Sequence, residues 1–244
     1  MSMQRVTLRL TELRCLSQTE SDGSEPYLWT TFFAFGGQQL PFQTGPLSTI
    51  TPSYDAFRSE FPDHVKAGMA VPVPPFIASG SFDIDMDAAP HPKIVGCIAV
   101  LMEEDSTPQS SIVLGRIAYA KEIDAQLQAL VNGRIRSGDF GPITQAEIDA
   151  VKKAVASKVE SAIASNQSIW NAFRDQDDEI GVSFKAFTDS EIRFQYFDLP
   201  DFVNGGNRFR LTGSLSLGPV PTAPTLTGPG SAAAPAPRSR PLAE

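Results

Sequence analysis

The first hundred residues are dominated by an alternation of apolar and polar positions with a period of two, the pattern of half-buried β-strands. Val6, Leu8 and Leu10 alternate with polar residues, and the apolar phase then slips to Leu13 and Cys15. Such a slip predicts a bulge or a bend inside a long first strand. Residues 82–86 repeat the alternation and predict another half-buried strand.

Two further segments, residues 27–35 and 94–102, are apolar on both faces. Aromatic and β-branched side chains are frequent in them, and this composition predicts central strands that are covered on both sides. Residues 71–75 read Val-Pro-Val-Pro-Pro. Because proline cannot donate to a sheet ladder, this segment is expected to be a sheet edge or an extended loop.

The period becomes helical in the middle of the chain. Apolar residues recur every three or four positions over residues 112–135, which predicts an amphipathic helix. A second helix is expected to begin at Thr144, because Glu147 three positions later completes a capping box. Its apolar face continues towards Phe173, with a kink expected near residues 165 and 166 if the helix runs that far. The two-residue period returns after residue 178 and predicts three more strands, the last over residues 209–217.

The order is therefore strands, a helical hairpin, and strands again. Each group of strands alone is too small for a core, so we expect one antiparallel β-sandwich of about eight strands, mainly β, interrupted by a two-helix hairpin. The expected division is residues 1–105 with 177–220 for the sandwich and 106–176 for the hairpin. Residues 221–244 are rich in Pro, Ala, Gly, Ser and Thr, a composition that predicts a disordered tail.

The charge balance narrows the choice of partner. The net charge is -8 and the sequence pI is about 4.8, which argues against nucleic acid as the main partner. An acidic chain is compatible with cation binding. The N-terminal residues carry no apolar signal-peptide core, and no apolar run is long enough to cross a bilayer. We therefore expect a chain that is cytoplasmic when made, with later release left open.

Catalytic signatures are missing from the sequence. The two histidines, His64 and His91, lie in irregular contexts, and there is no nucleophile elbow, Cys–His pairing, phosphate loop or dinucleotide fingerprint. Paired carboxylates can hydrolyse glycosides, but here the acids fall on short turns. The expectation is a binding protein and not an enzyme. Cys15 and Cys97 lie in apolar runs and are expected to be buried free thiols, with a disulfide as the alternative.

Acidic residues gather at the ends of predicted strands. The three groups are Asp22 and Glu25; Glu103, Glu104 and Asp105; and Asp175, Asp177 and Asp178. Loops at one end of a sandwich converge, and converging carboxylates repel one another unless a cation lies among them. Calcium fits such a site because it takes six to eight oxygen ligands in irregular geometry. Zinc fits less well because these loops lack His and Cys.

Three of these segments resemble the calcium loops of C2 domains. Residues 22–28 (Asp-Gly-Ser-Glu-Pro-Tyr-Leu) resemble the first calcium loop, and residues 101–105 and 178–181 resemble the start and the end of the third. The resemblance covers roughly residues 4–105 and 177–218. It implies an eight-stranded antiparallel sandwich that binds calcium at one tip and docks to acidic lipids. The ligands it implies are Asp22, Glu25, Glu103, Asp105 and Asp178.

The sequence departs from the C2 pattern in three ways. About 70 residues, including both helices, would interrupt the third loop, which is short in the family. Two ligand positions carry Glu in place of the usual Asp, which reaches farther and changes the cavity. No segment matches the second calcium loop well, although Asp83, Asp85 and Asp87 lie near the right place.

Three hypotheses of function follow. The first is a calcium-dependent module that docks to an anionic membrane surface or to a protein partner. The second is a structural or assembly protein that forms homo-oligomers through the hairpin or attaches to a larger particle through the tail. The third is a membrane-active effector whose hairpin unpacks and inserts. The sequence leaves open whether the hairpin projects or packs on the side of the sandwich, and packing is the simpler expectation.

Overall fold

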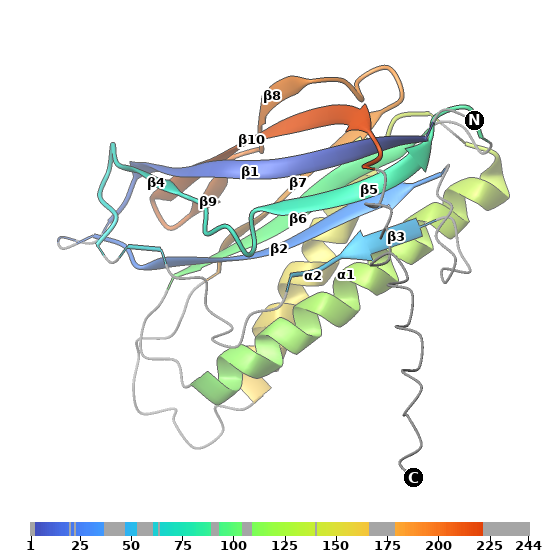
Figure 1. Cartoon of the computed structure of the whole chain (residues 1–244). Helices are drawn as coiled ribbons and strands as arrows, with labels where there is room; N and C mark the ends of the chain where they lie inside the picture. Colours follow the sequence, from blue (N-terminus) through green and yellow to red (C-terminus); the bar gives the residue numbers. More distant parts are fainter. Residues whose placement is uncertain are drawn as a thin grey trace, which may run out of the picture.

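The chain folds into two stacked antiparallel sheets with a helical hairpin as a third layer (Figure 1). The structure is a computed structural model. It describes residues 3–19, 21, 23–36, 47–52, 61, 62, 64–88, 93–103, 109–139, 141–165 and 179–221. The expected tail, apart from residue 221, lies outside these ranges. The described strands are β1 (Met3–Ser17), β2 (Pro26–Phe35), β3 (Leu47–Ile50), β4 (Ala70–Pro72), β5 (Ser79–Asp85), β6 (Ile94–Glu103), β7 (Glu179–Thr188), β8 (Gln195–Asp198), β9 (Phe202–Asn204) and β10 (Asn207–Pro219).

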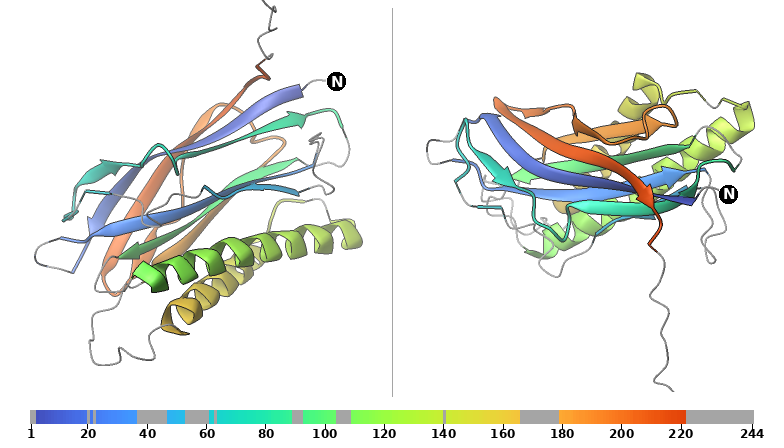
Figure 2. Two further views of the ribbon diagram at one scale, coloured as in Figure 1. Left: turned by 60° about the horizontal axis from the view of Figure 1, so that its bottom comes forward. Right: turned by 45° about the horizontal axis from the view of Figure 1, so that its top comes forward.

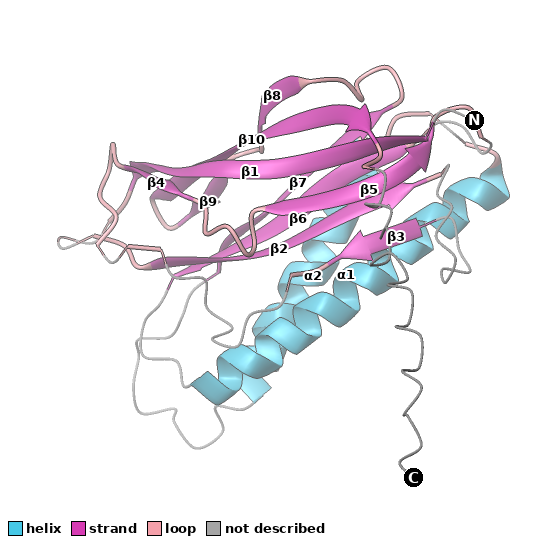
Figure 3. Cartoon of the chain, viewed as in Figure 1, coloured by secondary structure: helices cyan, strands magenta, loops and turns pink. Residues whose placement is uncertain are grey.

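The strands form a first sheet of six strands and a second sheet of four. In the first sheet the order is β4-β1-β10-β8, with β5 also paired to β1 and β9 to β10. In the second sheet the order is β3-β2-β6-β7. The expectation of a mainly β sandwich with a helical hairpin is confirmed (Figure 3). The strand number exceeds the expected eight because β3 and β9, of four and three residues, are too short to leave a periodic signal.

A first apolar core fills the space between the sheets. Leu8 of β1, Phe32 of β2 and Leu215 of β10 are completely buried in it. Both cysteines also lie there as free thiols, so that prediction is confirmed. Burial raises the pKa of the Cys97 thiol to about 12, so the thiol stays protonated and unreactive near neutral pH.

The irregular features of the first strands also match their patterns. The pairing of β1 with β10 shifts register between Leu10 and Glu12, where the apolar phase slips, so the expected bulge is confirmed. The segment with alternating prolines supplies β4, which is an edge strand of the first sheet. Its Pro72 pairs with Glu12 at that edge, where the missing N–H costs no central ladder bond.

The helices α1 (Gln109–Ser137) and α2 (Gln145–Ser165) lie in the connection between β6 and β7 and cover the outer face of the second sheet (Figure 2). A second apolar core separates them from the sheet, and Tyr119 of α1 contacts Trp29 of β2 with ring centroids 5.8 Å apart. The hairpin therefore packs on the sandwich. This third layer explains why every residue of β2 and of β6 is buried.

Polar contacts fix the turn between the helices. Thr144 caps α2: its N–H and hydroxyl both donate to Glu147 at 2.7 Å, and the Glu147 N–H donates back to the Thr144 hydroxyl at 3.3 Å. This confirms the capping box. Burial raises the pKa of Glu147, but the Thr144 hydrogen bonds and Arg134 outweigh this effect and leave the pKa below its usual value.

The expected continuation of the second helix beyond Ser165, with Phe173 and the kink, lies outside the described residues. Ile192, expected in a strand, is in the turn before β8 and is buried in the first core. None of the described helices combines the length and the apolar character that a membrane span requires.

Candidate functional site

One end of the second sheet brings together the three strand ends that adjoin the acidic segments named above. Pro26, the first residue of β2, pairs with Glu103, the last residue of β6. Met102 pairs in turn with Glu179, the first residue of β7, after a register shift. The start of β2, the end of β6 and the start of β7 therefore lie side by side, and we call this end of the sandwich the tip (Figure 1).

Glu103 turns inward at the tip. Its neighbours two and six positions earlier, Leu101 and Cys97, belong to the core between the sheets, and the alternation of a strand places Glu103 on the same side. The residue is only 4% exposed, and its Oε2 accepts a hydrogen bond of 3.0 Å from Asn207 Nδ2 of β10. Burial and the nearby Glu103 charge both raise the pKa of the Cys15 thiol. Glu103 thus joins the two sheets at the tip.

Glu25 lies at the surface of the tip. Its Oε1 is 3.6 Å from Nδ1 of His64, and both side chains are substantially exposed. His64 is therefore an exposed loop residue, as expected. The two loops are held together by a backbone bridge, in which Ser24 and Val65 exchange N–H to carbonyl bonds of 3.1 and 2.7 Å.

Gly23 allows this close crossing of loops. Its φ is +110°, a conformation that residues with a side chain rarely adopt, and a Cβ there would be 2.7 Å from the backbone carbon of His64. The glycine of the residue 22–28 motif is therefore required by the backbone, independently of any ion.

We expect Gly23→Ala to lower the free energy of unfolding by about 2 kcal/mol, because it adds strain at positive φ and a contact with backbone that cannot move aside. Gly68→Ala is the matched control: Gly68 also has a positive φ, +88°, but no atom lies within 4 Å of its would-be Cβ. Urea unfolding of both variants measures the difference. Equal losses would mean that the crossing with His64 contributes nothing.

The remaining implied ligands are not placed. Asp22, Asp105 and Asp178 lie outside the described residues, as do Glu104, Asp175 and Asp177. Within the described part of the chain, no group of three or more His, Cys, Asp or Glu side chains is arranged to hold a metal ion. Two of the five implied ligands, Glu25 and Glu103, are thus placed at the tip, and Glu103 points between the sheets.

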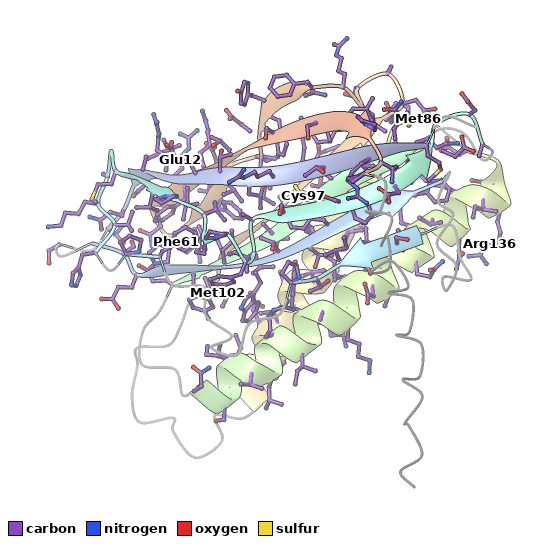
Figure 4. The ribbon with its side chains drawn as sticks, viewed as in Figure 1. Glu12, Phe61, Met86, Cys97, Met102 and Arg136 are labelled. Atoms are coloured by element: carbon purple, nitrogen blue, oxygen red, sulfur yellow. The ribbon has the colours of Figure 1, made fainter. Side chains whose placement is uncertain are left out.

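Asp83, Asp85 and Asp87, which lie near the place of the second calcium loop in the C2 pattern, are at the opposite end of the sandwich. Asp85 pairs with Met3 at the start of β1, whereas Cys15, the neighbour of Glu103, is twelve residues further along that strand. At about 3.3 Å per residue the two positions are roughly 40 Å apart. Figure 4 labels Met102 and Met86 at these two ends. Asp83, moreover, forms an ion pair with Arg5 at 2.7 Å.

A buried polar group at that opposite end escapes any sequence pattern. Lys93 is completely buried, and its Nζ donates to the carbonyl of Ala88. Burial lowers the pKa of Lys93, while the charges of Asp189, Asp85 and Asp87 oppose the shift. A lysine just before an apolar strand gives no sign of this, because one of the nearby charges, that of Asp189, comes from the connection that follows β7.

Comparisons with known proteins place the chain in no family. No protein-family model matches it, and no curated protein sequence does. Among solved structures, it is similar to a C2 domain of plant Extended Synaptotagmin 1, with 7% sequence identity and a TM-score of 0.33, over 91% of this chain and 99% of that one. A TM-score this low carries no argument about fold or function. The C2 resemblance stays a prediction from the sequence motifs.

Proposed function

We propose that the chain is a non-enzymatic binding module whose tip binds calcium and then docks to an anionic membrane surface or a protein partner. The strand register carries the proposal, because it brings the start of β2, the end of β6 and the start of β7 together. The chain next to these three ends contains the acidic segments. The proposed carboxylate ligands are Asp22, Glu25, Asp105 and Asp178, with Glu103 at the base of the site.

Glu103 has a specific part in this proposal. Its hydrogen bond to Asn207 fixes the end of β6 against β10, so the acidic segment that follows starts from a defined position. Calcium would neutralise the remaining carboxylates and remove their mutual repulsion, which turns an anionic tip into a neutral or cationic one. Only in that state would the tip approach an acidic lipid surface at low electrostatic cost.

The alternative, assembly through the hairpin, was motivated by the apolar face of the second helix, and the structure shows that this face is already covered. The apolar stripe of α2, including Val151, Val155 and Val159, is buried against the second sheet and α1 of the same chain. Pairing with another copy, or insertion into a membrane, would first have to expose that core. The tip proposal requires no such rearrangement.

Calcium titration tests the proposal. We expect calorimetric heat when calcium is added to chelator-treated protein, and a higher melting temperature that chelator reverses. Calcium at 100 times its dissociation constant would add about 2.7 kcal/mol to the free energy of unfolding. Asp105→Asn and Asp178→Asn should each weaken binding. Asp87→Asn, an exposed aspartate at the opposite end, is the matched control and should bind as the parent does.

Vesicle sedimentation then separates docking from ion binding. Phosphatidylcholine vesicles with phosphatidylserine should sediment the protein only with calcium, and vesicles without phosphatidylserine should not. Calcium binding without sedimentation would indicate a protein partner. If neither heat nor a melting shift appears, calcium has no part in the function of this chain.

A further inference from the structure

The outer face of the first sheet, opposite to the helices, carries pairs of polar side chains in rows across neighbouring strands. In Figure 2, β10, β1 and β5 lie side by side on this face. Arg5 pairs with Asp83 across β1 and β5 through two bonds of 2.7 and 2.8 Å. Thr7 and Ser81 share a hydroxyl hydrogen bond of 2.8 Å.

Three further arginines of this face are neutralised in the same way. Arg14 contacts Glu12 at 3.0 Å, and Arg208 and Arg210 both donate to Asp201 at 2.7 and 2.8 Å. These hydrogen bonds hold the pKa of the Asp201 carboxyl below its usual value, although burial opposes them. An acidic chain thus balances each of these surface cations with a carboxylate of its own.

Arg9 is the exception in this series. It lies between Thr7 and Thr11 on β1, opposite Ser79 of β5 on one side and Ser214 of β10 on the other. Among the described residues it has no carboxylate within ion-pair distance, and the hydroxyls of Ser79 and Ser214 form no hydrogen bond. One exposed guanidinium and two hydroxyl donors therefore lie in one row without an acceptor.

Arg9 and Ser214 line a hollow of about 780 Å³. We call it the Arg9 hollow. Its other wall is apolar, formed by the connection that leads from β4 into β5 and by the loop before β4. The residues of this wall include Phe61, Pro62, Pro72, Pro74, Pro75 and Phe76.

Exposed aromatic residues extend this surface on the far side of β10. Tyr196 of β8 pairs with Ser214 and is 78% exposed, and it contacts Phe194, which is 64% exposed, edge to face at 5.4 Å. Phe197, next in the chain, is buried in the core, so the tyrosine points outward. Exposed aromatic side chains beside a cation are typical of protein-binding surfaces, where tyrosine and arginine are enriched.

We propose that the Arg9 hollow binds an extended acidic peptide of a partner protein. A carboxylate of the peptide takes the two parallel N–H bonds that Arg9 offers, the geometry in which arginine binds carboxylates most strongly. Apolar or proline residues of the peptide lie against the proline and phenylalanine wall, as extended segments do in aromatic grooves. Charge complementarity selects the occupant, because the described residues that line the hollow include the Arg9 cation and the Ser214 hydroxyl but no carboxylate.

A displayed library of random decapeptides, selected on the full chain in the presence of chelator, tests the proposal independently of calcium. We expect enriched sequences with Asp or Glu next to apolar or proline residues. Fluorescence polarisation with a selected peptide should show binding weakened about tenfold by Arg9→Gln, the loss expected for a hydrogen-bonded charged contact. Phe76→Ala should also weaken it.

Arg14→Gln is the matched control: the same substitution on the same face, outside the hollow, should leave the affinity unchanged. Thermal melting confirms that the variants fold. Enrichment of neutral or basic peptides, no enrichment, or equal binding by Arg9→Gln would overturn the proposal. So would self-association that Arg9→Gln abolishes without any peptide binding, because the occupant would then be a second copy of the chain.

Discussion

Replacing Arg134 by Met is expected to remove about 3 to 5 kcal/mol from the free energy of unfolding, the cost of deleting one partner of a buried ion pair. The Arg134 side chain is only 5% exposed at the end of α1. It binds both Glu147 oxygens at 3.1 Å and the carbonyls of Gly141 and Pro142 at 2.7 and 2.6 Å. The substitution removes this donor from all of these acceptors, and among the described residues Glu147 keeps only its hydrogen bonds from Thr144.

Urea unfolding measures the loss, and hydrogen exchange locates it at the hairpin. Arg136→Ala is the control, since Arg136 is exposed and its side chain contacts only the Asn132 carbonyl among the described residues; it should change stability by less than about 0.5 kcal/mol. Arg134→Lys keeps the positive charge but loses the planar guanidinium. Its free energy of unfolding should therefore lie between those of the other two variants. If the Arg134→Met variant and the parent unfold at the same urea concentration, the turn does not depend on the hydrogen bonds of Arg134.

Gly96→Ala is expected to destabilise the chain by about 3 kcal/mol, through overpacking in the middle of the second sheet. A Cβ at Gly96 would lie 2.4 Å from Cζ of Phe33 and 2.5 Å from the carbonyl oxygen of Lys185. Phe33 cannot move freely, since its ring packs against Phe184 at 5.4 Å under the helices. Either the strands or the hairpin must shift.

Gly133→Ala is the matched control, and its expected effect on stability has the opposite sign. Gly133 lies within α1 and has no atom within 4 Å of its would-be Cβ, so alanine should stabilise the helix by about 1 kcal/mol. Thermal and urea unfolding of both variants provide the comparison. A Gly96→Ala protein as stable as the parent would mean that the sheet and hairpin adapt to a methyl group there.

Both sites concern the hairpin, and their positions explain its role in the fold. The second sheet has a core on each of its faces, one facing the first sheet and one facing the helices. Without the hairpin, the aromatic outer face of β2, with Tyr27, Trp29 and Phe33, would face water. The insertion between β6 and β7 is therefore part of the stabilising structure of the sandwich, and its first helix begins near the tip.

Local patterns account for what could be predicted. The phase slip at Leu13 gave the bulge in β1, the two fully apolar segments gave β2 and β6, and Thr144 with Glu147 gave the start of α2. Each of these signals is contained within about ten residues. The short strands β3 and β9 were missed because four or three residues cannot establish a period of two, whereas the prolines pointed to the edge strand β4.

The sequence by itself determined the type and order of the longer elements, the burial of both thiols and the acidic composition of the segments beside the tip. Only the tertiary structure decided that Glu103 turns inward to Asn207, 104 residues away, that Asp85 lies at the opposite end, and that Arg9 has no acidic partner among the described residues. The physical reason is the range of the interactions. Periodicity and capping act between neighbours in the chain, whereas strand register and charge pairing depend on which distant strands become adjacent.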